Sequence, residues 1–206
     1  MKVFIAIPCM ESLPVDFVIA LEKLQRVGLT SVNYSVGSLV YASRQYLAEE
    51  AVAAKADYIL WLDSDMIFDS DFLVDMLKHM DDGKDFVSAL YFKRKPPYNP
   101  VLYKKLRMGL TSKDSITEEY DDYPENSVFE IDACGFGGVL MKTKVVEDVI
   151  AHEGHTFAPI TGYGEDISFC IRAKRAGYKI WCDSSIKMGH ITKSVVDEST
   201  WKKLKK

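Results

Sequence analysis

The 206-residue sequence has no long hydrophobic run and little net charge. No window approaches the roughly 20 apolar residues that a transmembrane helix requires. The apolar part of the opening MKVFIAIPCM is too short for the core of a signal peptide. A formal net charge of −4 does not indicate a nucleic acid or an acidic polymer as partner. We therefore expect a cytoplasmic protein without a transmembrane segment, in which the basic tail WKKLKK makes at most weak contact with a membrane surface.

Cysteine pairs and nucleotide-binding glycine loops are also missing. The four cysteines are widely spaced and form no CxxC motif, which excludes the usual zinc and redox patterns. We expect them to be small buried hydrophobic residues in a reducing compartment. The sequence DACGFGG is rich in glycine but matches neither a phosphate loop nor a dinucleotide fingerprint, and the Ser, His and Asp order of a hydrolase is absent.

What the chain does contain is enough apolar sequence, 48% of its residues, for one sizeable core. Strands are predicted at 2–8, 31–36, 57–62 and 85–92, and helices at 15–28, 39–56 and 71–80. After residue 127, strands are predicted at 128–132, 137–142 and 178–183, and helices at 143–152 and 165–176. This alternation predicts a single α/β domain over 1–206 with a mainly parallel central sheet flanked by helices. Ligands of such sheets bind beyond the carboxyl ends of the strands.

Two segments depart from the alternation. Residues 93–127 are first basic and proline-bearing and then acidic and polar, which predicts a long loop or lid with a mobile acidic part. Residues 194–206 are predicted to be a solvated tail.

An acidic pair follows the buried strand YILWL. In an extended segment Asp63 and Asp65 face the same side, roughly 7 Å apart, and can present two carboxylates to one ligand. Carboxylates are ligands for Mg²⁺ or Mn²⁺, whose other positions phosphate oxygens and water fill. The alternative is a cap for the next helix, for which Asp69 and Asp71 are better placed.

Acidic residues also open the helix at 165–176, after a flexible turn that contains Gly162 and Gly164. The helix dipole favours the ionised forms of Glu165 and Asp166, so we expect lowered pKa values and at least one ionised base. The alternative role for both is an N-terminal cap that complements the dipole. His190 follows the last strand, where it is either a ligand for a divalent ion or a structural histidine.

The order of these motifs resembles the GT-A fold glycosyltransferases, most closely the inverting enzymes of family 2. The resemblance is carried by a strand ending in DSD, the glycine-rich GFGGVLMK, the helix start GYGED with R and AGY following, and GHI. It implies the GT-A (nucleotide-diphospho-sugar transferase) fold and an Mn²⁺ or Mg²⁺ ion held by Asp65, His190 and Asp63. It implies donor contacts from Pro8, Cys9, Arg44, Asp63 and Ser64. It also implies acceptor contacts from Gly137, Gly138, Tyr163 and Gly164, with Asp166 as the catalytic base and Glu165 beside it.

The implied reaction transfers one sugar from a nucleotide-diphosphate sugar, expected to be a UDP-sugar, to a hydroxyl of a saccharide or another acceptor. Inversion is expected because the sequence offers an apparent base and no obvious nucleophile. Transfer of a single sugar is favoured because the chain lacks the QxxRW motif of processive synthases. A retaining transferase of the same fold and a non-catalytic nucleotide-sugar binding module remain alternatives. A nucleotidyltransferase is disfavoured, since IPCMESLP stands where its glycine-rich basic loop would be.

Overall fold

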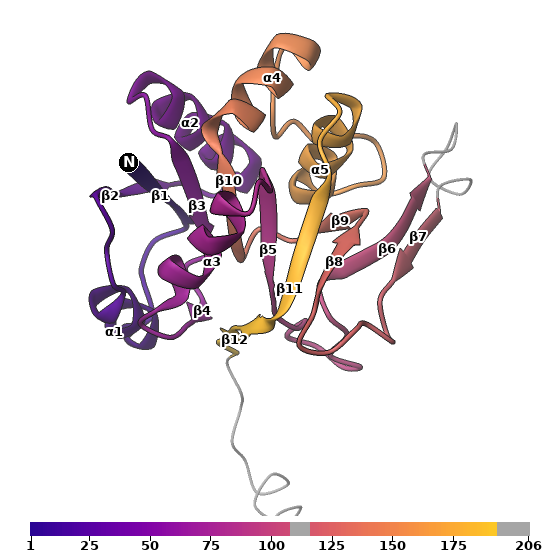
Figure 1. Ribbon diagram of the computed structural model, residues 1–206, viewed down its shortest axis with the longest axis horizontal. Coiled ribbons are helices and arrows are strands. Elements are labelled where there is room, and N and C mark those ends of the chain that lie inside the picture. The colour runs from indigo at the N-terminus through magenta and orange to yellow at the C-terminus, as the bar shows by residue number, and fades with distance from the viewer. Residues whose placement is uncertain (108–115, 193–206) are drawn as a thin grey trace, which may run out of the picture.

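A computed structural model of the chain describes residues 1–107 and 116–192, which form a central sheet with helices on both faces (Figure 1). The seven-stranded sheet has the order β2-β1-β3-β10-β5-β11-β8. Its strands are β1 (Lys2–Cys9), β2 (Leu29–Val36), β3 (Tyr58–Leu62), β5 (Phe86–Leu90), β8 (Val128–Ile131), β10 (Gly138–Lys142) and β11 (Ile180–Lys187). Strands β2, β1 and β3 are parallel, as are β5 and β11, whereas β10 and β8 run antiparallel to their neighbours. The predicted α/β class with a mainly parallel sheet is confirmed.

Each face of the sheet has its own hydrophobic cluster. The helices α2 (Val40–Ala53), α4 (Thr143–Glu153) and α5 (Glu165–Arg175) pack on one face, and α1 (Val15–Lys23) and α3 (Phe72–Asp81) on the other. Along β1, Phe4 and Ala6 belong to the first cluster, whereas Val3, Ile5 and Ile7 belong to the second. Because a central strand is buried on both faces, its sequence reads as a continuous apolar run.

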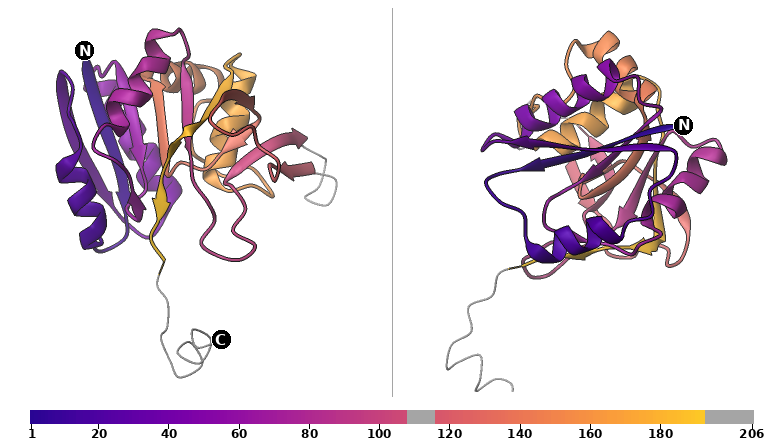
Figure 2. Two further views of the ribbon diagram at one scale, coloured as in Figure 1. Left: turned by 60° about the horizontal axis from the view of Figure 1, so that its bottom comes forward. Right: turned by 90° about the vertical axis from the view of Figure 1, so that its left-hand side faces the viewer.

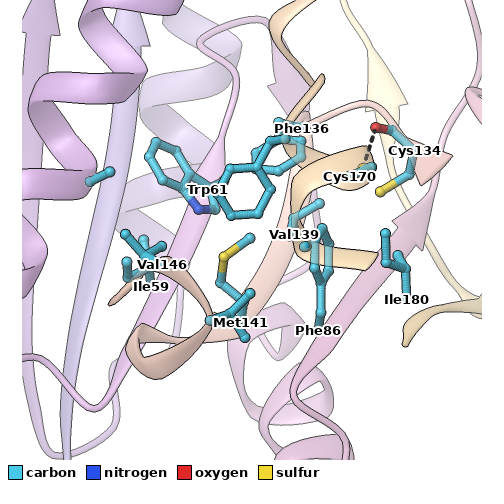
Figure 3. Packing of buried hydrophobic residues seen from close by; sticks show 14 of the residues in the cluster. Ile59, Trp61, Phe86, Cys134, Phe136, Val139, Met141, Val146, Cys170 and Ile180 are labelled. Atoms are coloured by element: carbon cyan, nitrogen blue, oxygen red, sulfur yellow. Dashed lines mark hydrogen bonds between the residues drawn. The ribbon is translucent and has the colours of Figure 1, made fainter. Parts of the chain in front are cut away.

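Aromatic rings fill the core between β3, β10, α4 and α5. Trp61 contacts the rings of Phe136 and Phe157 edge to face, at centroid distances of 5.8 and 5.0 Å. Figure 3 shows Trp61 and Phe136 together with the buried Cys134 and Cys170, whose Sγ lies 3.7 Å from the Cys134 carbonyl oxygen. All four cysteines are free, and Cys134, Cys170 and Cys182 are buried, as predicted, while Cys9 is half-buried.

Helix α1 is shorter than predicted, because it ends at Lys23 rather than near Gly28. The next residue, Leu24, takes an extended conformation, and the backbone N–H of Gln25 donates to the carbonyl of Ser70 at 2.7 Å. Gly28 has a φ of 60°, and a Cβ there would overlap the carbonyl oxygen of Met1. Gly28 therefore serves the start of β2 and not the end of the helix.

The segment 93–127 contains more regular structure than the long loop predicted from its composition. Strands β6 (Leu102–Arg107) and β7 (Ile116–Glu119) pair with each other, and β9 (Ala133–Cys134) extends them to a three-stranded sheet in the order β7-β6-β9. A further pair, β4 (Met66–Ile67) and β12 (Gly189–His190), brings the end of the described chain back to the residues after β3. Residues 108–115 of the predicted acidic loop, and the predicted tail, lie outside the described residues.

The described helices include none that is long and apolar enough to cross a membrane. Figure 2 shows that α2 and α1 lie on opposite sides of the sheet near the edge formed by β2.

Candidate functional site

A buried arginine joins two acidic residues that are far apart in the sequence. Arg44 on α2 is 2% exposed. Its Nη2 lies 2.7 Å from Oδ1 of Asp63, and its Nε lies 3.2 Å from Oε1 of Glu165. Burial alone would lower the pKa of Arg44, but the nearby carboxylates, chiefly Asp63 and Glu165, raise it above its ordinary value. The guanidinium is therefore a permanent positive charge that fixes the end of β3 against the start of α5.

The hydrocarbon and aromatic surroundings of Arg44 explain why it is so well buried. Its guanidinium carbon lies 5.3 Å from the ring centroid of Phe136 and 5.8 Å from that of Trp61. Aromatic faces attract a guanidinium, and they keep water from competing with the two carboxylates. In the structure Arg44 binds two protein side chains, Asp63 and Glu165. The contact with a nucleotide-sugar donor that the sequence suggested stays a prediction.

The two aspartates after β3 lie in a turn and have different partners. The N–H of Met66 donates to the carbonyl of Asp63 at 3.3 Å, so the segment is not the extended strand end on which the predicted side-by-side arrangement depended. Asp63 binds Arg44, whereas Oδ2 of Asp65 lies 2.8 Å from Nη1 of Arg94. The turn therefore directs the two carboxylates to different partners.

His190 is the second neighbour of Asp65. Its Nε2 lies 3.5 Å from the same oxygen of Asp65, and the backbone N–H of Ile191 donates to the Asp65 carbonyl at 2.8 Å. Nδ1 of His190 lies 2.8 Å from the carbonyl oxygen of Phe92. Since a carbonyl only accepts, Nδ1 carries a hydrogen, and Nε2 is the atom that faces Asp65.

The interaction between Asp65 and His190 lowers the pKa of Asp65 and raises the pKa of His190. Burial would raise the pKa of Asp65, but the hydrogen bond and charge of His190, together with Arg94, hold it below its ordinary value. Burial would lower the pKa of His190, and Asp65 with the Phe92 carbonyl raises it instead. At neutral pH Asp65 is therefore an anion, and the cation Arg94 lies beside it.

The described side chains at this edge could supply only part of the coordination of a divalent ion. Among the residues described, no three His, Cys, Asp or Glu side chains lie close enough to form a metal centre. Asp65 and Nε2 of His190 are a carboxylate and an imidazole of suitable type, and the Phe92 carbonyl orients the imidazole as ligands are commonly oriented. The remaining positions of an ion would come from water and from phosphate oxygens.

Asp166 is the acidic residue whose pKa differs most from the sequence-based expectation. Burial, and then the charge of Glu165, raise the pKa of Asp166 to about 6, although Arg44 and the N–H of Ile167 act in the opposite direction. The Ile167 N–H donates to Oδ1 of Asp166 at 2.7 Å. The prediction that the helix dipole lowers this pKa was therefore wrong, because burial outweighs the dipole. A carboxyl with this pKa is mostly ionised at neutral pH and accepts a proton readily, as a general base must.

Three glycines between β9 and β10 make room for Tyr91 and Met188. A Cβ at Gly135 would overlap the Tyr91 hydroxyl, and one at Gly138 would overlap the Met188 sulfur. The N–H of Gly137 donates to the Tyr91 hydroxyl at 3.1 Å. The three glycines thus have a packing reason in this fold, while contact of Gly137 and Gly138 with an acceptor stays a prediction.

Tyr91 and Arg94 are site residues that the motifs did not single out. The Tyr91 ring lies 5.7 Å from that of His190, nearly perpendicular to it, and its burial raises the Tyr91 pKa well above the ordinary value. Tyr91 follows β5 directly, and Arg94 lies three residues later, beyond the carboxyl end of that strand. Position is the sequence signal for Tyr91, whereas Arg94 also belongs to the basic segment that begins at residue 93.

The other predicted residues lie at the same edge. Pro8 and Cys9 end β1, and the N–H of Gly37 donates to the Cys9 carbonyl at 3.0 Å. Ser64 lies in the turn between the two aspartates. The Tyr163 hydroxyl lies 3.4 Å from the Arg107 carbonyl oxygen, and Gly164 is the N-cap of α5.

Two cavities lie elsewhere in the fold. One of about 330 Å³ lies between α3 and β11, and one of about 570 Å³ lies near Trp181. Neither is lined by the predicted site residues.

Part of the chain matches a known sequence family. Residues 48–139, which include both aspartates of the turn but not Arg44, Asp166 or His190, match the family described as Glycosyl transferase family 2. No curated protein matches the chain.

Three solved structures share the fold at low sequence identity. A197 from STIV is 19% identical with a TM-score of 0.66, over 93% of this chain and 86% of that one. S. aureus TarS 1-349 is 13% identical with a TM-score of 0.57, over 92% of this chain and 60% of that one. GalNAc-T7 with UDP, GalNAc and Mn²⁺ is 12% identical with a TM-score of 0.53, over 87% of this chain and 35% of that one. The fold is the GT-A fold, and the chain spans only part of the length of the last two structures.

Proposed function

We propose that this chain, which has the GT-A fold and matches Glycosyl transferase family 2 over residues 48–139, is a glycosyltransferase that transfers one sugar in a metal-dependent reaction. The donor is a nucleotide-diphosphate sugar, with UDP as the nucleotide to be tested first, and the acceptor is a hydroxyl of a saccharide or another small compound. The observation that carries the proposal is the link through Arg44, which binds Asp63 at one end and Glu165, the neighbour of Asp166, at the other. Arg44 thereby links Asp63, a candidate contact of the donor, to the segment that carries the candidate base Asp166.

Asp65 and His190 would hold a Mn²⁺ or Mg²⁺ ion. When bound, the ion supplies Lewis-acid stabilisation of the charge that develops on the departing diphosphate. Asp65 would contribute an anionic oxygen, and neutral His190 would contribute an Nε2 lone pair, because its hydrogen is on Nδ1 and is bonded to the Phe92 carbonyl. Pro8, Cys9 and Ser64 would contact the nucleoside from the ends of β1 and β3.

Asp63 has a positioning role in this proposal. Arg44 holds its Oδ1, and 30% of the Asp63 side chain stays exposed, which leaves it able to accept a hydrogen bond from a ribose hydroxyl. A carboxylate fixed in advance loses little side-chain entropy when the ligand arrives.

Asp166 would take the proton from the acceptor hydroxyl as that oxygen attacks the anomeric carbon. Its pKa of about 6 keeps most of the group ionised at pH 7 and still basic. Tyr163 and Gly164, next to it, would contact the acceptor, with Gly137 and Gly138 nearby as further candidates. A single base, with no nucleophile assigned on the other face of the sugar, favours inversion.

Two alternatives have distinct consequences. A retaining transferase would give a product with the anomeric configuration of the donor. A non-catalytic nucleotide-sugar binding module would bind the donor through Asp65 but would have no use for Asp166 as a base.

The first experiment is calorimetric titration of UDP into the protein with Mn²⁺ and then with EDTA. We expect binding that requires the ion and that Asp65→Ala abolishes, while Asp75→Asn on the exposed side of α3 behaves as wild type. GDP, CDP and dTDP follow if UDP fails, and failure of all four contradicts the proposal.

The second experiment measures release of UDP from UDP-sugars. We expect Asp166→Asn to bind UDP like wild type and to lose turnover by about 10²-fold or more, as for removal of a general base. Unchanged turnover in Asp166→Asn would instead mean that Glu165 and Asp166 have a structural role at the start of α5.

A further inference from the structure

One edge of the central sheet has none of the features that usually prevent strands from associating. Strand β2 lies at the edge, and all eight of its residues pair in unbroken parallel register with β1. Its sequence, LTSVNYSV, contains no charged residue and no proline. Within residues 1–107 and 116–192, no strand pairs with the outer side of β2. The right-hand view of Figure 2 faces this edge, with α2 above it and α1 below it.

Large apolar side chains are exposed around this edge. We call the following six residues the β2 surface: Val15 (72% exposed), Val18 (38%), Ile19 (46%), Leu29 (74%), Tyr34 (45%) and Val36 (70%). Three of them follow the i, i+3, i+4 spacing along α1, while Phe17, Ala20 and Leu21 of the same helix are buried against the sheet. Helix α1 therefore exposes three apolar residues on the side away from its buried face, and the exposed Glu22 follows them on the same stripe.

The opposite edge of the sheet shows how the same chain protects a strand. Strand β8 has only four residues, and its Glu130 forms an ion pair with Lys179 at 2.9 Å. Short length and charge are common ways to keep an edge strand from pairing with another chain. The contrast between the two edges indicates that the exposure of β2 serves an interaction.

We propose that β2 pairs with β2 of a second copy of this chain, in antiparallel orientation about a twofold axis perpendicular to the sheet. Such an axis places each residue opposite one of the same parity, so Thr30, Val32, Tyr34 and Val36 meet one another. Val32 packs with the α1 and α3 cluster, which places these β-branched and aromatic side chains on the α1 face. The strand carries no charge, and its own copy therefore meets no like charge.

Helix α1 supplies the observation that selects a second copy as the partner. Asp16 lies in its first turn and Lys23 in its last turn, both exposed and on the same stripe as Ile19. A twofold axis that makes β2 antiparallel to its copy also makes the two α1 helices antiparallel. Asp16 of each copy then faces Lys23 of the other, with the apolar residues between them. The surface is self-complementary in charge as well as in hydrogen bonding.

The first test is the mass of the chain in solution by sedimentation velocity over a range of concentrations. We expect a dimer for wild type, and a dissociation constant raised by at least about tenfold in Tyr34→Lys and in Ile19→Lys. Lysine at position 34 places a charge in the proposed interface, at a residue that has one acidic and one basic neighbour, Glu22 and Arg26. Val128→Lys, at an exposed valine of the β8 edge, is the matched control and should dimerise as wild type.

A charge exchange tests the symmetry itself. Asp16→Lys should weaken the dimer, and the double variant Asp16→Lys with Lys23→Asp should restore it, because each Lys then faces an Asp again. A structural effect on one helix would not be repaired by the second change. Hydrogen exchange of the amides of 29–36 gives a further readout, since their protection should rise with protein concentration.

Three results would overturn the inference: a monomer at all concentrations with β2 amides unprotected, a dimer that neither lysine variant weakens, or a monomer that sediments with phosphatidylcholine vesicles. The last would assign the β2 surface to a membrane.

Discussion

Nη2 of Arg44 lies 2.7 Å from Oδ1 of Asp63, in a place where the guanidinium is sealed from water by Phe136 and Trp61. Nε of the same guanidinium binds Glu165, so one cation neutralises an acid from each half of the candidate site. Charges in low-dielectric surroundings interact strongly but are costly to leave alone. The site therefore depends on Arg44 for its stability as well as for its geometry.

Replacing Arg44 by Met should destabilise the protein by about 2–4 kcal/mol, because two carboxylates would lose their buried partner. The figure lies below the upper end of the usual range since Asp63 keeps 30% of its side chain exposed. Urea denaturation measures it. Lys78→Met is the control: Lys78 is 68% exposed and pairs with Asp75, so its loss should leave the stability close to that of wild type. Equal losses in the two variants would contradict the role given to Arg44.

The pH dependence of transfer should show an acidic limb near pH 6, because the base Asp166 loses its ionised form as the pH falls through its pKa of about 6. Glu165 is the largest charge that raises this pKa, and Glu165→Gln should lower it and move the limb to lower pH. The measurement is kcat/KM from pH 4.5 to 8. A limb that stays in place in Glu165→Gln would show that another group titrates.

The same pKa makes a prediction about stability. The folded-state pKa of Asp166 is about 6 against an ordinary value of 3.8, so the folded state favours the protonated form. That contribution to stability is fully present below pH 3.8 and is lost as the pH rises through 6. Asp166→Asn should therefore be more stable than wild type at pH 8 by about 1–3 kcal/mol, with the difference vanishing near pH 4. A variant less stable at pH 8 would contradict the raised pKa.

The sequence predicts the order of strands and helices well because that information is local. The alternating apolar runs from β1 to β5, the helix at α2 and the buried cysteines all follow from the spacing of neighbouring residues. The candidate residues at the carboxyl edge follow from one further rule, that ligands bind where parallel strands end.

What the sequence does not predict depends on contacts between distant residues. Glu165 lies 121 positions from Arg44, so their pairing has no local signal. The raised pKa of Asp166 comes chiefly from burial, which only the packed fold determines. The contact between Arg94 and Asp65 joins the basic, proline-bearing start of the segment 93–127 to the DSD motif. Such a segment is the kind that composition alone assigns to a loop.

Replacing Arg94 by Ala should raise the affinity for Mn²⁺ in the absence of nucleotide. A guanidinium 2.8 Å from the Asp65 carboxylate repels a second cation there. The effect should be about two- to fivefold, because the pair is partly exposed and such pairs are worth little. Mn²⁺ titration followed by electron paramagnetic resonance measures it. Lys95→Ala, which removes a neighbouring exposed charge, is the control, and a Mn²⁺ affinity in Arg94→Ala equal to that of Lys95→Ala would count against competition at Asp65.

Replacing Gly135 by Ala should destabilise the protein by about 1–3 kcal/mol, the usual effect of overpacking a core. The new methyl would overlap the hydroxyl of Tyr91, a ring that is 3% exposed and lies against His190. Tyr91 would have to move within the core and would lose its bond to the Gly137 N–H. Gly37→Ala is the matched control. Its Cβ would lie 3.4 Å from the Ser43 hydroxyl oxygen and its φ is not positive, so a neutral or slightly stabilising change is expected there. Thermal unfolding of the two variants separates the cases, and a Gly135→Ala protein as stable as Gly37→Ala would mean that Tyr91 moves freely. His190 would then lack the rigid neighbour that helps hold its imidazole toward Asp65.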